Sequence, residues 1–311
     1  MTDNKRDRIV VALGGNALGR TPEEQLSLIR ITASTIVDLL HTGQDVVVTH
    51  GNGPQVGFLL RRAELALDEL PALPLDVLGA DTQGATGYLF TRNLRGCLAE
   101  RGIDRQVVAV VTQSLVDPDD PAFAEPSKPI GSFMDEAEAR EHERKDGWVL
   151  REDSGRGWRR VVASPQPLDI LERRVIGSLV DSGCVVVACG GGGIPVRREG
   201  TEYVGVEAVI DKDFASALLA NQLGVDDFAI CTAVDAVSLN YGTPEQIDLR
   251  ELTVEEAERH LAEGQFGEGS MAPKVQAAVN FLLNGGRRVV ITSLARLRDA
   301  VDGRAGTVIT R

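Results

Sequence analysis

The fold is decided by residues 8–54, which read RIVVALGGNALGRTPEEQLSLIRITASTIVDLLHTGQDVVVTHGNGP. Arg8–Leu13 is an apolar, β-branched run that predicts a buried strand, and a Gly-Gly-Asn turn follows it. A helical pattern then extends near Pro22–His41, Gly43 ends it, and Asp45–Thr49 predicts the next strand. This order of strand, glycine turn, helix and strand is typical of a βαβ unit, whose two strands lie parallel.

The rest of the chain repeats this alternation. Further strands are expected at Gln106–Thr112, Cys184–Cys189, Phe228–Thr232, Arg288–Thr292 and Gly306–Thr310. Helices are expected after Gly51–Gly53 with Pro54 in the first position, over most of Asp76–Arg101, and at Leu168–Leu179, Asp211–Leu223, Ala272–Leu283 and Leu294–Val301. Near-continuous apolar strands separated by helices predict an α/β fold with a mostly parallel sheet covered on both faces.

The segment from Asp117 to Arg160 interrupts this rhythm. It is rich in Asp, Pro, Glu, Arg and Trp and has little clean periodicity. So long an irregular segment inside a compact domain is usually a lid or an inserted subdomain, although a solvated surface excursion would look similar. Lys128 near its beginning favours the lid.

Composition excludes several classes of protein. The 311 residues carry 33 basic and 46 acidic side chains, a net charge of −13, which argues against nucleic acid or an anionic membrane as a partner. No apolar run approaches the roughly 18–20 residues that span a bilayer. Residues 1–8 are polar and charged, so no signal peptide is expected, and the four cysteines lack C-x-x-C spacing. These features predict a cytoplasmic protein with reduced thiols.

Lysine is scarce in this chain. The 33 basic residues include only Lys5, Lys128, Lys145, Lys212 and Lys274. A single lysine is usually a solvated charge, but Lys128, Lys212 and Lys274 stand in turn-like or helix-end contexts. Phosphoryl transfer needs cations around the oxygens of the moving group, and a lysine provides a compact point charge. The pattern therefore predicts a phosphate site, provided that the fold brings the three lysines together.

Three glycine-rich turns follow predicted strands: Gly14-Gly15-Asn16, Gly51-Asn52-Gly53 and Gly190–Gly193. Ligands bind outside the carboxyl ends of parallel strands, where glycines let the backbone approach an anion. Neither standard nucleotide fingerprint is present, because there is no G-x-x-x-x-G-K-[ST] run and the third glycine of Gly51–Gly57 comes one residue late for G-x-G-x-x-G. These absences exclude a P-loop enzyme and argue against an NAD-dependent dehydrogenase.

The residues around Lys212 allow more than one role. Asp211 and Asp213 either orient the lysines or hold a metal through water, but Asp211 also fits a helix N-cap. His50 touches the second glycine turn and is interpreted as structural. The four histidines do not form a metal-ligand set.

With these residues identified, the chain resembles the carbamate kinases of the amino acid kinase superfamily. The matching runs are Val11–Leu18, Thr49–Gly57, Lys128–Gly131, Val162–Pro165, Gly190–Pro195, Val209–Asp213, Gly269–Val275 and Gly303–Thr307, in order over essentially the whole chain. The runs around Lys128 and Lys274 are the narrowest of these signatures. Ser127 and Ser132–Met134 depart from the expected threonine and aromatic run, which affects only the fine contacts of the lid.

The resemblance implies a single domain over residues 1–311 with an open αβα sandwich, a protruding lid at 117–160 and a homodimeric assembly. The N-terminal half, about residues 1–180, would bind carbamate or carbamoyl phosphate. The C-terminal half, about residues 181–311, would bind ATP or ADP with Mg²⁺. The reaction implied is reversible phosphoryl transfer between ATP and carbamate, usually run toward ATP synthesis in arginine or carbamoyl phosphate catabolism. Carbamate is already an anion and needs no general base.

The resemblance also assigns roles by motif. Gly14, Gly15, Asn16, Gly51, Asn52 and Gly53 would hold the substrate. Lys128, Lys212 and Lys274 would contact phosphate oxygens, with Asp211 as organiser and no metal ligand from the protein. Ala233, Asp235, Val237, Tyr241, Met271, Pro273 and Lys274 would surround the nucleotide. Two alternatives stay open: a sister enzyme such as acetylglutamate kinase, whose motifs should lack the Lys128 run, and a binding protein without turnover.

Overall fold

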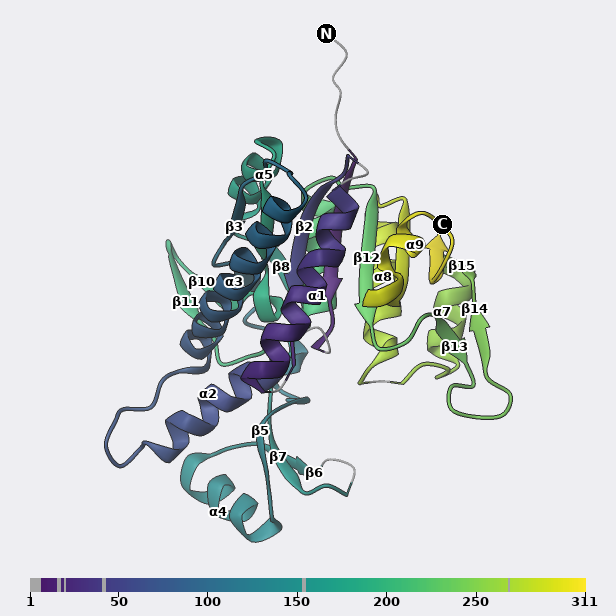
Figure 1. The fold of residues 1–311 in the computed structure, drawn as a ribbon. Helices are drawn as coiled ribbons and strands as arrows, with labels where there is room; N and C mark the ends of the chain where they lie inside the picture. Colours follow the sequence, from purple (N-terminus) through teal and green to yellow (C-terminus); the bar gives the residue numbers. More distant parts are fainter. Residues whose placement is uncertain (1–6, 16–17, 20, 41–42, 153–154, 268) are drawn as a thin grey trace.

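An eight-stranded sheet runs through the protein (Figure 1) in the computed structural model, which describes residues 7–15, 18–19, 21–40, 43–152, 155–267 and 269–311. Its spatial order is β15-β17-β16-β12-β1-β2-β9-β3. The strands are β1 (Arg8–Leu13), β2 (Asp45–His50), β3 (Val107–Ala109), β9 (Val185–Ala188), β12 (Asp227–Thr232), β15 (Glu251–Thr253), β16 (Arg288–Ser293) and β17 (Thr307–Thr310). All neighbours pair in parallel except β16 and β17, so the predicted mostly parallel sheet is confirmed.

Helices cover both faces of this sheet. On one face lie α1 (Pro22–Leu40), α3 (Leu75–Glu100) and α9 (Leu297–Val301), which follows the short 3-10 turn η4 (Leu294–Arg296). On the other lie α5 (Arg173–Asp181), α6 (Lys212–Gln222), α7 (Val254–Ala262) and α8 (Met271–Leu283). After α1, Gly43 adopts a φ of 86°, which a residue with a side chain rarely reaches, and the chain turns into β2.

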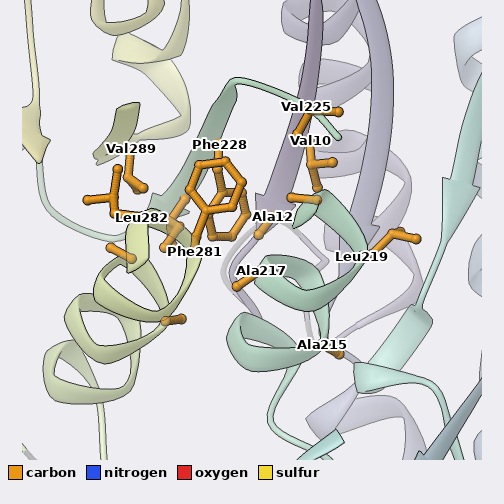
Figure 2. Packing of buried hydrophobic residues seen from close by; sticks show 14 of the residues in the cluster. Val10, Ala12, Ala215, Ala217, Leu219, Val225, Phe228, Phe281, Leu282 and Val289 are labelled. Carbon is orange, nitrogen blue, oxygen red and sulfur yellow. The ribbon is translucent and has the colours of Figure 1, made fainter. Parts of the chain in front are cut away.

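The strand β1 shows how the two faces are packed. Val10 and Ala12 point into the cluster on the α6–α8 side, whereas Ile9 and Val11 point to the α1–α3 side. In Figure 2, Val10 and Ala12 lie against α6, and Phe228 of β12 meets Phe281 of α8 with ring centroids 5.4 Å apart. Both rings are fully buried, and such burial contributes about 3 kcal/mol per side chain. A central strand buried on both faces reads as continuous β-branched sequence, which is why the prediction for β1 is correct to the residue.

The lid protrudes from one end of the sheet (Figure 1). It consists of β5 (Lys128–Met134), α4 (Glu136–Asp146), β6 (Leu150–Glu152) and β7 (Trp158–Val162), with the strands in the order β5-β7-β6. Arginine–aromatic stacking supports it, with Arg140 lying 4.6 Å from the ring of Trp158 and Arg160 lying 4.7 Å from the ring of Trp148. At its base, Ile130 and Val162 join an apolar cluster with α2 (Gly53–Leu65) and α3.

Three parts of the predicted secondary structure differ from the structure. Leu168–Leu179 is not one helix, because β8 (Pro167–Ile170) pairs with β4 (Gln113–Val116) before α5 begins. The strand β8 is only four residues long, and its register with β4 shifts between Leu115 and Val116, so it leaves no regular strand pattern in the sequence. The strand expected at Gln106–Thr112 is shortened to Val107–Ala109. The sequence did not predict α7, β15 or several small elements. These small elements are η2 (Pro121–Phe123), η3 (Gly190–Gly192), β10 (Ile194–Glu199), β11 (Glu202–Gly205), β13 (Val237–Leu239) and β14 (Ile247–Leu249).

Candidate active site

The N-terminus of α6 organises the lysine cluster. Asp211 has extended backbone angles, and its Oδ1 accepts a hydrogen bond from the Asp213 amide at 2.9 Å, so the N-cap interpretation is confirmed. Its other oxygen, Oδ2, accepts from Lys128 Nζ at 2.8 Å. Lys128 is the first residue of β5, so this ion pair ties the base of the lid to the start of α6.

Asp213 joins the other two lysines, which is the orienting role that the sequence left open for it, although the family resemblance named only Asp211 as organiser. Lys212 Nζ donates to its Oδ1 and Lys274 Nζ donates to its Oδ2, the latter at 3.2 Å. Lys274 comes from the first turn of α8 and also donates to the Ser270 carbonyl at 3.1 Å. The fold thus gathers lysines from β5, α6 and α8 around two carboxylates. Asp213 is 2% exposed, which makes it a fixed anchor for both ammonium groups.

The electrostatics of the cluster favour an anionic ligand. Burial alone would raise the pKa of Asp211, but the ion pair with Lys128 outweighs it and holds that pKa below the usual range. By formal charge, two carboxylates face three lysines, which leaves one local positive charge. The side chain of Lys128 is 36% exposed and those of Lys212 and Lys274 are 12% and 15% exposed, so the lysine on the lid is the most accessible of the three.

Two glycine turns lie beside Lys212. The Gly14 amide donates to the Cys231 carbonyl at 3.1 Å, and the Gly51 amide donates to the Leu13 carbonyl at 3.2 Å. A Cβ on Gly51 would lie 3.5 Å from Lys212 Cδ. A Cβ on Gly15 or Gly53 would meet nothing within 4 Å, so the backbone there borders open space. Asn16, which was also assigned to the substrate, lies outside the described residues.

Asn52 is held within the protein. Its residue is 7% exposed, and Nδ2 donates to Thr82 Oγ1 of α3 at 2.7 Å. On the other side its carboxamide touches the third glycine turn, because a Cβ on Gly191 would come within 2.3 Å of Nδ2. The structure therefore places Asn52 at the junction of the second and third glycine turns.

His50 supports the second glycine turn, Gly51–Gly53. Its Nδ1 lies 2.8 Å from the Gly51 carbonyl, and its ring stacks on Phe90 at a centroid distance of 5.6 Å. The pKa of His50 is lowered to about 4, mainly by burial and to a lesser extent by the positive charge of Lys212, while the bond to Gly51 opposes the shift. The imidazole is therefore neutral near pH 7 and Nδ1 donates to the Gly51 carbonyl, which agrees with a structural role.

A cavity of about 200 Å³ adjoins the lysines on the α8 side. Its walls include Ala233, Tyr241 and Met271 from the predicted nucleotide set, and Ser270, whose carbonyl binds Lys274. Val237 is fully buried, the Asp235 carbonyl accepts from Thr292 Oγ1 at 3.2 Å, and Pro273 lies in the first turn of α8. Val234 and Ala236 of the wall lie within the predicted stretch Ala233–Val237, and the wall residues that were not predicted are Thr232, Ser238, Gln265, Phe266 and Gly267.

Comparison with known proteins identifies the family of this chain. The model of the amino acid kinase family matches residues 7–293. A carbamate kinase of Pyrococcus horikoshii is 47% identical over 98% of this chain and 99% of its own, and a carbamate kinase-like protein of Escherichia coli is 49% identical over 97% and 98%. The solved carbamate kinase of Giardia lamblia bound to AMP-PNP superimposes with a TM-score of 0.93 at 41% identity, covering 98% of this chain and 99% of that one. The chain belongs to the amino acid kinase family and, within it, to the carbamate kinases.

Proposed function

We propose that this protein catalyses reversible phosphoryl transfer between ATP and carbamate, giving ADP and carbamoyl phosphate. The observation that carries the proposal is the meeting of Lys128, Lys212 and Lys274 around two carboxylates, beside glycine turns at the carboxyl ends of β1 and β2. Relatives with 47% identity over nearly the whole chain are carbamate kinases, and they do not favour acetylglutamate kinase.

The site divides into two sides that meet at Lys212. The nucleotide enters the cavity lined by Ala233, Tyr241 and Met271, which brings its terminal phosphate toward Lys274. Carbamate lies against the turns at Gly14–Asn16 and Gly51–Gly53. A nucleotide on one side and an acceptor on the other fit in-line transfer, in which positioning and charge neutralisation supply most of the catalysis.

The chemical step requires little from the protein. A carbamate oxygen forms a bond to the γ-phosphorus, the bond from that phosphorus to the β–γ bridging oxygen breaks, and the electron pair leaves with ADP. Because the nucleophile is already an anion, no proton has to be removed. With its pKa lowered to about 4, the buried His50 is a weak base, which agrees with a mechanism that uses no base. The lysines neutralise the charge on the transferring oxygens.

The two aspartates prepare the lysines for this task. Without a carboxylate, three ammonium groups would repel one another and spread apart. Asp213 holds Lys212 and Lys274 within reach of one phosphoryl group, and Asp211 holds Lys128 at the lid. Donors fixed before the substrate arrives lose little entropy on binding, which is the advantage of a preorganised site.

We infer that Mg²⁺ enters with the nucleotide, bound to its phosphate oxygens. Among the described residues, no three acidic, histidine or cysteine side chains cluster as a metal site, and Asp211 and Asp213 are engaged by lysines. These residues fit an ion that keeps several waters and takes its other ligands from the substrate. The proposed contribution of Asp211 and Asp213 to the ion is through water.

The cellular setting is a further part of the proposal. The resemblance supports a homodimer that acts in the cytoplasm and consumes carbamoyl phosphate to make ATP in arginine or carbamoyl phosphate catabolism. The net charge of −13 suits a partner set without nucleic acid or anionic lipid. In the described part of the chain, none of the helices is long and apolar enough to cross a membrane.

One coupled assay tests the proposed reaction. The protein is given ADP, Mg²⁺ and carbamoyl phosphate, and ATP is measured as it forms. Acetyl phosphate replaces carbamoyl phosphate in a parallel reaction, and ATP with N-acetylglutamate is tested for ADP release. The Lys274→Ala variant, purified identically, controls for contaminating kinases. ATP formation from carbamoyl phosphate alone is expected, and ADP release with N-acetylglutamate in its place would contradict the assignment.

A further inference from the structure

The third glycine turn is packed tightly between the turn that carries Asn52 and the residue that precedes Asp211. Gly191, Gly192 and Gly193 have φ values of 68°, 92° and 87°, which favour glycine. A Cβ on Gly191 would lie 2.3 Å from the Asn52 carboxamide, and one on Gly192 would lie 2.5 Å from the Ile210 carbonyl. The turn therefore rests against the substrate turn on one side and against the residue before Asp211 on the other.

The buried carboxamide of Gln83 fastens this turn to α3. Its Nε2 donates to the Gly190 carbonyl at 2.9 Å and to the Thr112 carbonyl at 3.0 Å, while its Oε1 accepts from the Thr112 amide at 2.7 Å. Gln83 is 5% exposed, so these bonds are shielded from water. Losing the partner of a buried polar group costs more than the bond itself contributes, because the remaining group is left unsatisfied.

A second side chain holds the far end of the turn. Ser114 Oγ donates to the Gly192 carbonyl at 2.7 Å, and the residue is fully buried. Gln83 and Ser114 thus fix two carbonyls of the turn, those of Gly190 and Gly192.

We propose that Gln83 is a positioning residue for the carbamate side of the active site, acting through the turn at Gly190–Gly193 on Asn52 and on the start of α6. The proposal rests on the carbamate kinase function given above. Gln83 is buried and its carboxamide bonds to backbone groups of Thr112 and Gly190, so we assign it an indirect role. Its carboxamide sets where the turn lies, and the turn sets where Asn52 and the segment carrying Lys212 lie.

This role predicts an unequal effect on the two substrates. The lining of the nucleotide cavity comes from residues between Thr232 and Tyr241 and from 265–267 and 270–271, whereas Gln83 contacts the segments around Thr112 and Gly190. A turn that shifts would displace the carbamate side and leave the nucleotide cavity in place. A displacement of about 1 Å near reacting groups can cost on the order of 10²-fold in rate. A residue that only stabilised the fold would lower the melting temperature without separating the two substrates.

The test uses Gln83→Met, which keeps the length of the side chain and removes all three hydrogen bonds. We expect the KM for carbamoyl phosphate to rise and kcat/KM for it to fall by about 10²-fold, with the KM for ADP unchanged. Asn221→Leu is the matched control, because Asn221 Nδ2 also donates to two backbone carbonyls, those of Phe281 and Asn284, at a distance from the turn. That variant should lose stability and keep both KM values.

Ser114→Ala keeps the test decisive where Gln83→Met does not fold. It removes one hydroxyl from the same turn, and a smaller rise in the KM for carbamoyl phosphate alone is expected. The wild-type protein in the same assay tests the proposed function separately, since only an active parent makes the variants informative. With an active parent, equal changes in both KM values, or wild-type kinetics in the folded variants, would overturn the positioning role.

Discussion

The anchor role of Asp213 leads to a sharp prediction for Asp213→Asn. The substitution keeps the size of the side chain and removes the negative charge shared by Lys212 and Lys274. Asparagine can still accept one hydrogen bond, but its amide end repels a second ammonium group. The two lysines would then lose their common anchor and move apart.

The magnitude follows from the geometry. At 3.2 Å, the separation of Lys274 Nζ and Asp213 Oδ2, Coulomb's law with an effective dielectric constant of about 20 gives about 5 kcal/mol. Desolvation offsets part of this attraction, and removing one partner of a buried ion pair typically costs about 3–5 kcal/mol. We therefore expect a clearly lower melting temperature. Because a misplacement of about 1 Å can cost on the order of 10²-fold, we expect kcat to fall by at least that factor.

A second buried carboxylate provides the control. Asp227 lies at the opposite end of β12 and also holds two cations, Arg287 at 2.9 Å and Arg288 at 2.8 Å. Asp227→Asn should destabilise the protein through the same kind of loss and leave turnover intact. Both variants are assayed for ATP formation well below their melting temperatures. Equal turnover in the two variants would refute the reasoning, because the charge on Asp213 would then serve only the fold.

Three further predictions address other parts of the site. Lys212→Arg should lose most turnover with a nearly unchanged melting temperature, because the wider guanidinium cannot occupy the position of the ammonium group beside Gly51; wild-type turnover would show that charge alone matters. Met134 and Trp158 are paired across β5 and β7, so replacing residues 135–157 by a short glycine-serine linker should preserve ADP binding, measured by calorimetry, and weaken the use of carbamoyl phosphate. Equal loss of both would argue against a lid on the substrate side. His50 has a pKa of about 4 in the folded protein and about 6.5 in the unfolded chain. As the pH is lowered, the imidazole of the unfolded chain therefore binds its proton first. The free energy of unfolding should fall by on the order of 3 kcal/mol between pH 6.5 and 4. Denaturant titrations of His50→Gln should lack this part of the pH dependence.

The sequence predicts the central strands well for a physical reason. β1, β2, β12 and β16 are buried on both faces, so burial demands an apolar residue at nearly every position and leaves an unmistakable run. β8 and the β10–β11 hairpin are partly exposed and four to six residues long. At that length, packing against a neighbour decides between strand and helix, and the neighbour is not visible in the local sequence.

The lysines of the site were predictable because each stands at the end of an element. Which aspartate pairs with which lysine was not predictable. Asp211 and Asp213 flank Lys212 symmetrically in the sequence, yet one faces the lid and the other faces α8. The helix explains the difference: Asp211 is the N-cap, outside the first turn, whereas Asp213 lies within it and is turned into the protein. Gln83 gave even less signal, because its importance depends on the distant turn that it meets.

Asp213 and Asp227, which each pair with two cations, also explain why an arginine-rich chain retains lysine at the active site. At the start of β12, Asp227 has only to hold that strand to the start of β16, and its two cations are Arg287 and Arg288. At the start of α6, the cations on Asp213 are Lys212 and Lys274. A guanidinium presents a planar fork that matches a carboxylate and binds it at two points. The remaining donors of a guanidinium are spread over a wide plane, so an arginine paired with Asp213 could not place one of them where the compact ammonium group lies. An ammonium group has three donors on one compact centre, so it can keep its bond to Asp213 and still donate to a phosphate oxygen. A carboxylate paired with two arginines therefore serves as a structural ion pair, whereas a carboxylate paired with two lysines leaves ammonium groups that can bind phosphate.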